Sequence, residues 1–419
     1  MTIRLRPTLS RLPAVLGALL CAGTLAACSS TAASDDSDSI TVGLLLPFTG
    51  SSSGTASNFE RAVLYAADRV NEGGGVKGHH LRVVSRDTHS DLERSKTSVM
   101  QLIDAGAVVV IGPESDEIAE EIAPILQAHQ VGLLSPLVGA ADDDAVDCSH
   151  PWFRLAPSAR ALGEALAKLV VTQQVHSVAL MYAASNYDEA LRDAVRSRFE
   201  TLGGSVSLEL RLDPNAQSYA EQVEQARSAN VDAIVLTSSP RAGALVVNEF
   251  DALSATPPRW FLSPLLKTDL LVQNVAPEAL EGALGVAPSI QDTSGDFPTA
   301  FGERWQGDVP LEGAYFYYDA LGLLALAIQK TTLDASGAIT LKALEAGLLS
   351  AAGPPGEDAG WDNLETGLQQ LRNGENIYYS GLTGPLLLNA CGERAIGLTT
   401  PWEVHAGSIQ DDAESASGN

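Results

Sequence analysis

Several acidic and histidine residues of this chain could in principle hold a metal ion. Imidazole and carboxylate groups are common metal ligands, and four of them fall within a short stretch: His79, His80, Asp87 and His89. We interpret this stretch as an ordinary turn, because the side chains at 79 and 80 diverge on a turn. A run of aspartates at 142–147 lacks the ligand spacing of a known calcium loop and is interpreted as a solvated loop.

Glycines could also indicate phosphate binding. The three glycines at 73–75 follow a predicted helix and not a strand, so they do not form a phosphate-binding loop. We therefore expect a protein that is not an enzyme and that needs no metal or other cofactor.

The first 28 residues indicate where the protein resides. Arg4, Arg6 and Arg11 are followed by an apolar stretch over 13–27, which is typical of a secretory signal. An ordinary signal peptide or a short membrane helix is the alternative, but the stretch is shorter than the roughly 20 residues that cross a bilayer. Leu25-Ala26-Ala27-Cys28 resembles the bacterial lipobox. The resemblance implies a lipoprotein signal peptide over 1–27, with lipid added to Cys28.

Length and charge describe the remaining body. The 419 residues suffice for two or three domains, and no later stretch is apolar enough for a membrane helix. Residues 1–27 contain three arginines and no acids, so their removal changes the formal charge from −26 to −29. Such a body would be repelled by nucleic acid and by anionic membranes. We interpret the charge mainly as an aid to solubility and expect an extracytoplasmic protein held at a bacterial membrane.

The cysteines and the two ends complete this organisation. Once Cys28 carries lipid, Cys148 and Cys391 remain, and they can either pair in an oxidising compartment or stay as separate thiols. Residues 28–38 are small and polar and predict a flexible tether, and 411–419 predict a disordered tail.

Strands and helices alternate along the body. A nearly continuous apolar run at 40–46 is typical of a parallel strand buried on both faces. Further strands are predicted at 81–86, 108–111, 131–134, 177–182, 205–212, 232–237 and 259–262. Helices are predicted between them at 58–71, 97–105, 117–129, 189–202, 219–229 and 241–253. The second half repeats the first, so the pattern predicts two α/β lobes with doubly wound parallel sheets and a ligand cleft between them.

Motifs along the whole body resemble one family. The opening run and six later segments are similar, in order, to the branched-chain amino-acid type of periplasmic binding protein: Ile40–Gly50, Val70–Gly78, Ile111–Ser115, Leu134–Pro136, Phe153–Ser158, Tyr318–Ala320 and Leu382–Leu386. The resemblance implies the type I fold, in which three crossovers join the lobes. It assigns 39–154 with 290–384 to lobe 1 and 157–286 with 386–408 to lobe 2. Because the crossovers are neighbours in such a fold, it also favours a Cys148–Cys391 disulfide.

The resemblance assigns candidate ligand contacts in the first lobe. The family serine that holds the ligand carboxylate maps to Asp116, beside Ser115, and the family threonine maps to Gly139, near Leu137. Tyr315 is a further candidate for the cleft. The alternative is that Asp116 does not contact ligand and is an ordinary residue at a helix N-terminus, where the helix dipole favours an acid.

The second lobe contributes the other candidates. The family aromatic contact maps to Tyr187, which could instead be a packing residue, and a second tyrosine position maps to Ser239, next to Ser238. The acid that pairs with the ligand ammonium maps to Leu265. An α-amino acid would then lack a partner for its ammonium and would meet Asp116 with its carboxylate, which is costly on burial. We therefore expect a small polar ligand, such as an amino acid, an amide or a related or cationic compound, with hydroxyl, amide or cationic ligands fitting best.

The resemblance implies a monomeric, lipid-anchored solute-binding protein that delivers its ligand to the permease of an ABC importer. The alternative is a sensory or structural lipoprotein with the same fold and a degenerate or repurposed cleft. No nucleic-acid partner is expected.

Overall fold

Five parallel strands form the first sheet, in the order β2-β1-β3-β4-β5. Six consecutive residues of the interior strand β1 are buried, as expected for a strand covered on both faces. The bounds are β1 (Ser39–Leu46), β2 (His80–Asp87), β3 (Ala107–Ile111), β4 (Gly132–Ser135) and β5 (Trp152–Arg154). The computed structural model describes residues 39–50, 53–139, 152–253, 257–292, 295–395 and 397–411.

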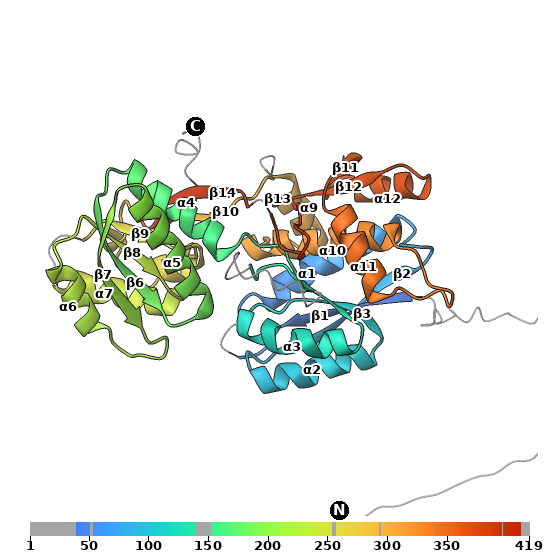
Figure 1. The fold of residues 1–419 in the computed structure, drawn as a ribbon, viewed down its shortest axis with the longest axis horizontal. Coiled ribbons are helices and arrows are strands. Elements are labelled where there is room, and N and C mark those ends of the chain that lie inside the picture. Colours follow the sequence, from blue (N-terminus) through green and yellow to red (C-terminus); the bar gives the residue numbers. More distant parts are fainter. Residues whose placement is uncertain are drawn as a thin grey trace, which may run out of the picture. The chain divides into compact units, whose positions relative to one another are not determined.

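Helices cover both faces of this sheet (Figure 1). Leu45 packs with α2 (Leu92–Asp104) and α3 (Asp116–Ala128) on one face. Val42 and Leu44 belong to the larger cluster on the other face, because successive strand residues point in opposite directions. The helices of that larger cluster are α1 (Ala56–Glu72), α9 (Asp296–Arg304), α10 (Glu312–Lys330), α11 (Leu341–Ala351) and α12 (Leu364–Arg372).

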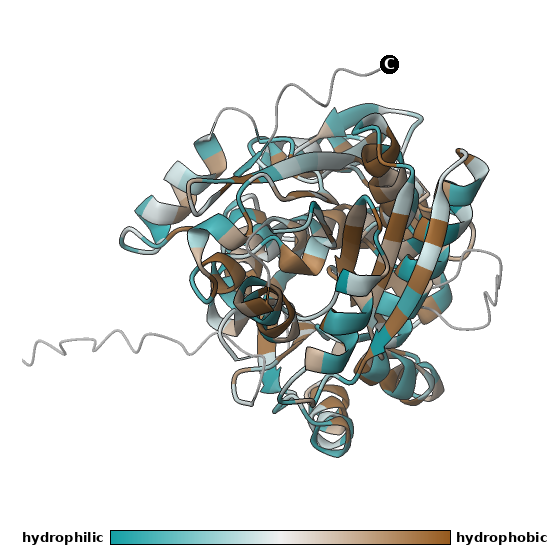
Figure 2. Cartoon of the chain, turned by 90° about the vertical axis from the view of Figure 1, so that its left-hand side faces the viewer, coloured by the Kyte–Doolittle hydropathy of each residue, from teal (hydrophilic) through white to brown (hydrophobic). Residues whose placement is uncertain are grey.

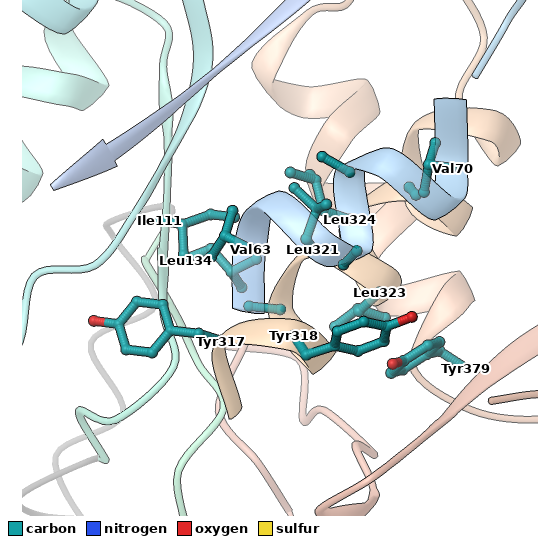
Figure 3. Close-up of a cluster of buried hydrophobic side chains, with 14 of the residues drawn as sticks. Val63, Val70, Ile111, Leu134, Tyr317, Tyr318, Leu321, Leu323, Leu324 and Tyr379 are labelled. Atoms are coloured by element: carbon teal, nitrogen blue, oxygen red, sulfur yellow. The ribbon is translucent and has the colours of Figure 1, made fainter. Parts of the chain in front are cut away.

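Figure 3 shows part of this larger cluster, where Val63 of α1 lies beside Ile111 and Leu134 from the ends of β3 and β4. Residues 314–328 of α10 are buried on every side of the helix. A small third sheet lies against α10 and α12, and its strands are β11 (Glu357–Ala359), β12 (Ile377–Gly381) and β13 (Gly384–Pro385).

The second sheet has seven strands, in the order β15-β14-β10-β9-β8-β6-β7. Five of them are parallel, and β14 and β15 are antiparallel additions at one edge. The bounds are β6 (Ser177–Ala183), β7 (Ser205–Leu212), β8 (Ala233–Thr237), β9 (Trp260–Leu262), β10 (Leu284–Pro288), β14 (Thr399–His405) and β15 (Ser408–Asp411).

The helices of the second lobe also cover two faces. Leu180 packs with α4 (Ala159–Thr172) and α5 (Asn186–Thr201), whereas Met181 packs on the opposite side. The elements on that side are α6 (Ala220–Ser228), α7 (Pro240–Leu253), η2 (Pro264–Leu266), α8 (Asp269–Val272) and η3 (Pro277–Ala279). Figure 2 shows the matching sequence pattern, with helices that are teal on one side and brown on the other.

Three connections join the lobes: β5 to α4, β10 to α9, and β13 to β14. Arg394 ties the first connection to the third, because its guanidinium donates hydrogen bonds to the carbonyl oxygens of Leu155 (3.2 Å) and Thr383 (2.5 Å). The second connection is joined to the third by Ser289, whose N–H donates to the carbonyl oxygen of Leu398 (2.9 Å). The connections therefore form one bonded hinge.

Two boundaries differ from the prediction. The segment around residue 392 was assigned to lobe 2, but it lies beside β5 of the first sheet. The N–H of Arg154 donates to the carbonyl oxygen of Gly392 (2.8 Å), and the N–H of Arg394 donates to the carbonyl oxygen of Arg154 (3.1 Å). At the other end, Asp411 belongs to β15 and pairs with Trp402, so this residue is part of the sheet and not of a tail.

Several predicted features fall outside the described residues: the signal peptide 1–27, Cys28 with the tether to 38, Cys148, and residues 412–419. Cys391 is disulfide-bonded. Its pairing with Cys148 stays a prediction.

Candidate functional site

A pocket of about 380 Å³ receives residues from both lobes. It lies beyond the carboxyl ends of β3, β4, β6, β9 and β10, where ligands bind in open α/β sheets. The first lobe contributes Phe59, Glu114, Ser115, Asp116, Glu117, Leu137, Glu312, Gly313 and Phe316. The second lobe contributes Leu162, Ser185, Tyr187, Pro264, Leu265 and Pro288, and the first connection contributes Ala156 and Pro157.

The start of helix α3 brings polar groups to the pocket. Ser115 caps this helix: its hydroxyl accepts a hydrogen bond from the N–H of Ile118 (3.3 Å) and donates one to Oε2 of Glu117 (2.8 Å). Asp116 is the first residue of α3, next to this cap. Two carboxylates, Asp116 and Glu117, thus follow the cap directly and line the pocket.

Asp116 is in an unusual environment for a carboxylate. Burial is the main cause that raises the pKa of Asp116 to about 7, and Glu117, Glu120 and Asp188 raise it further while Arg154 opposes them. Its Oδ2 atom is buried without a hydrogen-bond partner among the described residues. Such a perturbed acid in a cleft is a common mark of a functional site.

A second acid lies behind the pocket on helix α5. Asp188 is 3% exposed, and burial raises its pKa to about 6. The hydroxyl of Ser185, a pocket residue, donates a hydrogen bond to Oδ2 of Asp188 (2.7 Å). The two lobes thus bring Asp116 and Asp188 close enough to repel each other.

Two further acids line the pocket from the first lobe. Burial raises the pKa of Glu114, whose Oε1 accepts a hydrogen bond from the hydroxyl of Thr88 (3.2 Å). Glu312 begins helix α10 and forms an ion pair with Lys267 of the second lobe, with 2.6 Å between Oε1 and Nζ. Lys267 also pairs with Asp411 at 2.6 Å. This ion pair connects the two lobes at the pocket.

Aromatic rings form the apolar part of the wall. Phe59 of α1 stacks on Tyr317, with 4.9 Å between ring centroids and 15° between planes. Phe316 of α10 is 4% exposed. Tyr187 is half-buried against the α4–α5 core, and burial raises the pKa of its phenol. The pocket can therefore hold a hydrocarbon group beside a charged one.

The structure brings five of the predicted ligand contacts together at the pocket: Ser115, Asp116, Leu137, Tyr187 and Leu265. Four others do not line it. Gly139 packs so closely on the carbonyl of Pro157 that a β-carbon would collide with it. Ser238 is fully buried, and its hydroxyl donates to the carbonyl oxygen of Ser239 (3.2 Å).

Ser239 and Tyr315 are the other two predicted contacts that do not line the pocket. The hydroxyl of Ser239 caps α7 by accepting a hydrogen bond from the N–H of Ala242 (3.4 Å). Tyr315 lies in the core, where its ring packs on Phe297 with centroids 4.9 Å apart. The next residue, Phe316, lines the pocket instead, because each step along a helix turns the side chain by about 100°.

The prediction missed Phe59, Phe316, Glu114 and Glu312, which all line the pocket. The two phenylalanines belong to helices with long apolar stretches, so they look like core residues. Glu114 follows directly after the Gly112-Pro113 turn at the end of β3, and this position was the signal that could have identified it.

The family follows from comparison with known proteins. Residues 39–365 match the family described as periplasmic binding protein, so the chain belongs to this family. Its members bind solutes outside the cytoplasm and are not enzymes, which confirms the predicted class. One Gly-x-Ser-x-Gly spacing occurs at 50–54, between β1 and α1 in the chain, and its central serine lies outside the described residues.

Individual relatives are distant, and one of them extends over most of the chain. BasB of Halobacterium salinarum, the substrate-binding protein of a chemotactic signal transduction system, is 23% identical over 369 residues, which are 85% of each chain. The Leu/Ile/Val-binding protein BraC3 of Rhizobium johnstonii is 21% identical over 217 residues, 52% of this chain and 59% of its own.

Solved structures confirm the two-lobed type I fold. The leucine-binding protein LivK of Thermotoga maritima matches with a TM-score of 0.73 at 19% identity, over 89% of this chain and 98% of its own. A solute-binding protein from R. palustris, solved in complex with benzoate, matches with a TM-score of 0.69 at 18% identity, over 89% of this chain and 95% of its own.

None of the helices in the described residues is long and apolar enough to cross a membrane. Within the same residues, no group of three or more histidine, cysteine, aspartate or glutamate side chains is placed to hold a metal ion.

Tyr187 provides a direct test of the pocket. We expect Tyr187→Ala to weaken solute binding about tenfold or more, because it removes a large aromatic wall from the second lobe. Titration calorimetry with any solute that the wild-type protein binds measures this effect. Tyr182→Ala is the matched control, since Tyr182 lies on β6 beside Arg192 and outside the pocket. Equal affinity of both variants would remove Tyr187 from the site.

Proposed function

We propose that this protein is a lipid-anchored solute-binding protein that captures a small polar solute between its lobes and delivers it to an ABC importer. The pocket supports this proposal most directly, because residues of both lobes line it. A solute held there gains contacts that neither lobe offers alone. Binding would therefore favour a closed arrangement about the hinge, which a membrane partner can recognise.

The Lys267–Glu312 ion pair fits this mechanism. Lys267 is largely buried and shares its charge with Asp411 in the second lobe, so the lysine keeps a partner when the lobes separate. Glu312 is about half exposed, so its bond to Lys267 is a modest contribution to closure. The ion pair would therefore help to align the two lobes in the closed form and would add little to the stability of that form.

A second role, in signalling, is supported by the likeness to BasB, whose name describes a chemotactic signal transduction system. Both roles begin with the same capture of a solute, and they differ in the membrane partner. Cells that lack the gene separate them when uptake of radiolabelled solutes and directed motility are measured in parallel. Loss of uptake alone supports import, loss of the response alone supports signalling, and loss of neither contradicts both.

The proposed anchor predicts a change of location. Lipid chains hold a protein at a membrane by burying CH₂ groups at about 0.8 kcal/mol each, so two or more chains give stable attachment. We expect Cys28→Ser to move the protein from the membrane fraction to the soluble extracytoplasmic fraction. Immunoblots of fractionated cells measure this, with Cys391→Ser as a control that keeps residue 28 intact. A Cys28→Ser protein that stays in the membrane fraction would contradict lipid attachment at this cysteine.

A further inference from the structure

The charges around the pocket restrict the class of ligand more than the volume of the pocket does. We propose that the pocket takes a small organic cation, an ammonium-bearing solute with a hydrocarbon part and no free carboxylate. This inference rests on the proposed function and specifies its ligand class.

Apart from the phenol of Tyr187, the ionisable residues that line the described pocket are all carboxylic acids: Glu114, Asp116, Glu117 and Glu312. None of the lining residues is a lysine, arginine or histidine. The segments between 39 and 419 that lie outside the described residues contain no lysine or arginine, and His150 is their one histidine. A ligand carboxylate would therefore meet negative charge without a basic side chain in the wall to balance it.

The two basic residues that interact with the pocket acids, Lys267 and Arg154, are already engaged. Lys267 holds Glu312 and Asp411, each at 2.6 Å. Arg154 forms an ion pair with Glu393, and its guanidinium lies over the ring of Trp152 at 4.5 Å from the centroid. Arg154 lowers the pKa of Asp116, but it does not line the pocket. The negative charges of Glu114, Asp116 and Glu117 thus have no direct ionic partner among the described residues.

Two of these acids are also poorly compensated. Oε2 of Glu114 and Oδ2 of Asp116 are buried without a hydrogen-bond partner among the described residues. Burying a carboxylate without a partner is unfavourable, and a cation in the adjacent pocket would offset that cost through space.

The rest of the wall suits the rest of such a ligand. Phe59, Phe316 and Tyr187 supply aromatic surface, and aromatic faces attract ammonium groups. Leu137 and Leu162 add apolar surface for a hydrocarbon group. A pocket of about 380 Å³ is at the small end of the usual range for ligand sites.

Three matched probes test the charge preference: leucine, 3-methylbutylamine, which is leucine without its carboxylate, and 4-methylpentanoate, which is leucine without its ammonium. Calorimetric titrations use the full chain in detergent at pH 8. We expect 3-methylbutylamine to bind at least about tenfold more tightly than leucine, and 4-methylpentanoate to show no binding. Tighter binding of leucine or of 4-methylpentanoate would overturn the inference.

Two variants locate the interaction. Asp116→Asn should weaken binding of 3-methylbutylamine about tenfold to hundredfold, as expected for loss of a charged partner. Asp104→Asn makes the same change on the exposed end of α2, outside the pocket, and should leave the affinity unchanged. Circular dichroism confirms that each variant is folded. Equal affinity of both variants would overturn the assignment to this pocket.

If none of the three probes binds, small molecules retained from a cell extract are identified by native mass spectrometry of the full chain. A retained cation without a carboxylate supports the inference, and a retained carboxylate overturns it while leaving solute binding intact. No retained solute at all would contradict the proposed function itself.

Discussion

Replacing Asp319 by alanine is expected to lower the free energy of unfolding by about 3–5 kcal/mol, because it removes the acceptor at the centre of the hinge. Asp319 is fully buried on α10. Its carboxylate accepts hydrogen bonds from the N–H groups of Leu382 and Thr383, both at 2.8 Å, and from the hydroxyl of Tyr379 at 2.9 Å. Alanine would leave these donors buried without partners.

The same change should loosen the connections between the lobes. Burial lowers the pKa of the Arg394 guanidinium to about 10, and the negative charge of Asp319 opposes this effect. Removing that charge takes away a favourable electrostatic interaction of Arg394, whose guanidinium bonds the carbonyl oxygens of Leu155 and Thr383.

Urea unfolding measures the loss of stability at Asp319. Asp358→Ala is the control, because Asp358 is an exposed residue of β11, and it should change stability by less than about 0.5 kcal/mol. Asp319→Asn keeps one carbonyl acceptor and should fall between the two. A loss at Asp319→Ala no larger than that of the control would contradict the central place of this carboxylate in the hinge.

The second large effect is a change of the free energy of unfolding with pH. Asp116 and Asp188 have pKa values raised to about 7 and about 6, whereas the pKa of an aspartate in the unfolded chain is about 3.9. The folded state therefore binds more protons than the unfolded state between these values. The contribution of both groups is fully present below about pH 4 and is lost as the pH rises through the folded values. We expect the free energy of unfolding of the ligand-free protein to fall between pH 5 and pH 7.5.

The charged groups that face Asp116 support the predicted direction of the pH effect, a fall in the free energy of unfolding as the pH rises. Glu117 and Glu120 lie on its own helix and Asp188 on α5, and all three raise the pKa of Asp116, while Arg154 of β5 lowers it. The acid Asp232 has a lowered pKa, so its stabilisation is lost only in the acid range, below the window considered. Burial also raises the pKa values of Glu114 and Asp319, so these acids contribute with the same sign. The fall between pH 5 and pH 7.5 is therefore assigned to the buried acids, with Asp116 and Asp188 among them.

Asp116→Asn tests this assignment. The variant should be more stable than the wild type by roughly 1–3 kcal/mol at pH 7.5 and by less than half of that at pH 5, because the difference disappears only below about pH 4. Urea unfolding at both pH values measures it, with Asp104→Asn as the exposed control. A residue that lowers stability at neutral pH is typical of a binding site, where function restrains stability. A wild type with equal stability at both pH values would refute the raised pKa values.

Most of the scaffold could be predicted from the sequence because each element has a clear period. The apolar run predicted at 40–46 is β1 (Ser39–Leu46), and the strand predicted at 205–212 is β7 with the same bounds. Buried parallel strands have continuous apolar runs, and amphipathic helices have an apolar stripe. The β11-β12-β13 sheet was not predicted, because its strands are only two to five residues long.

The site was harder to predict, for two physical reasons. Helix α10 is buried on all sides, so its sequence has no polar face that would show whether Tyr315 or Phe316 points to the pocket. Hydroxyl groups were the second difficulty. Ser238 and Ser239 bond to nearby backbone atoms, and sequence alone does not distinguish a capping serine from one that binds ligand.

A thermal unfolding screen of the full chain tests the central claim, that the pocket between the lobes binds a solute. The panel contains amino acids, amides, amines, polyamines, sugars and nucleosides. A ligand at 100 times its dissociation constant stabilises the folded state by about 2.7 kcal/mol, which corresponds to a shift of several degrees. The account predicts such a shift with one chemical class, and its loss in Tyr187→Ala. Unchanged unfolding temperatures across the whole panel would contradict a solute-binding role.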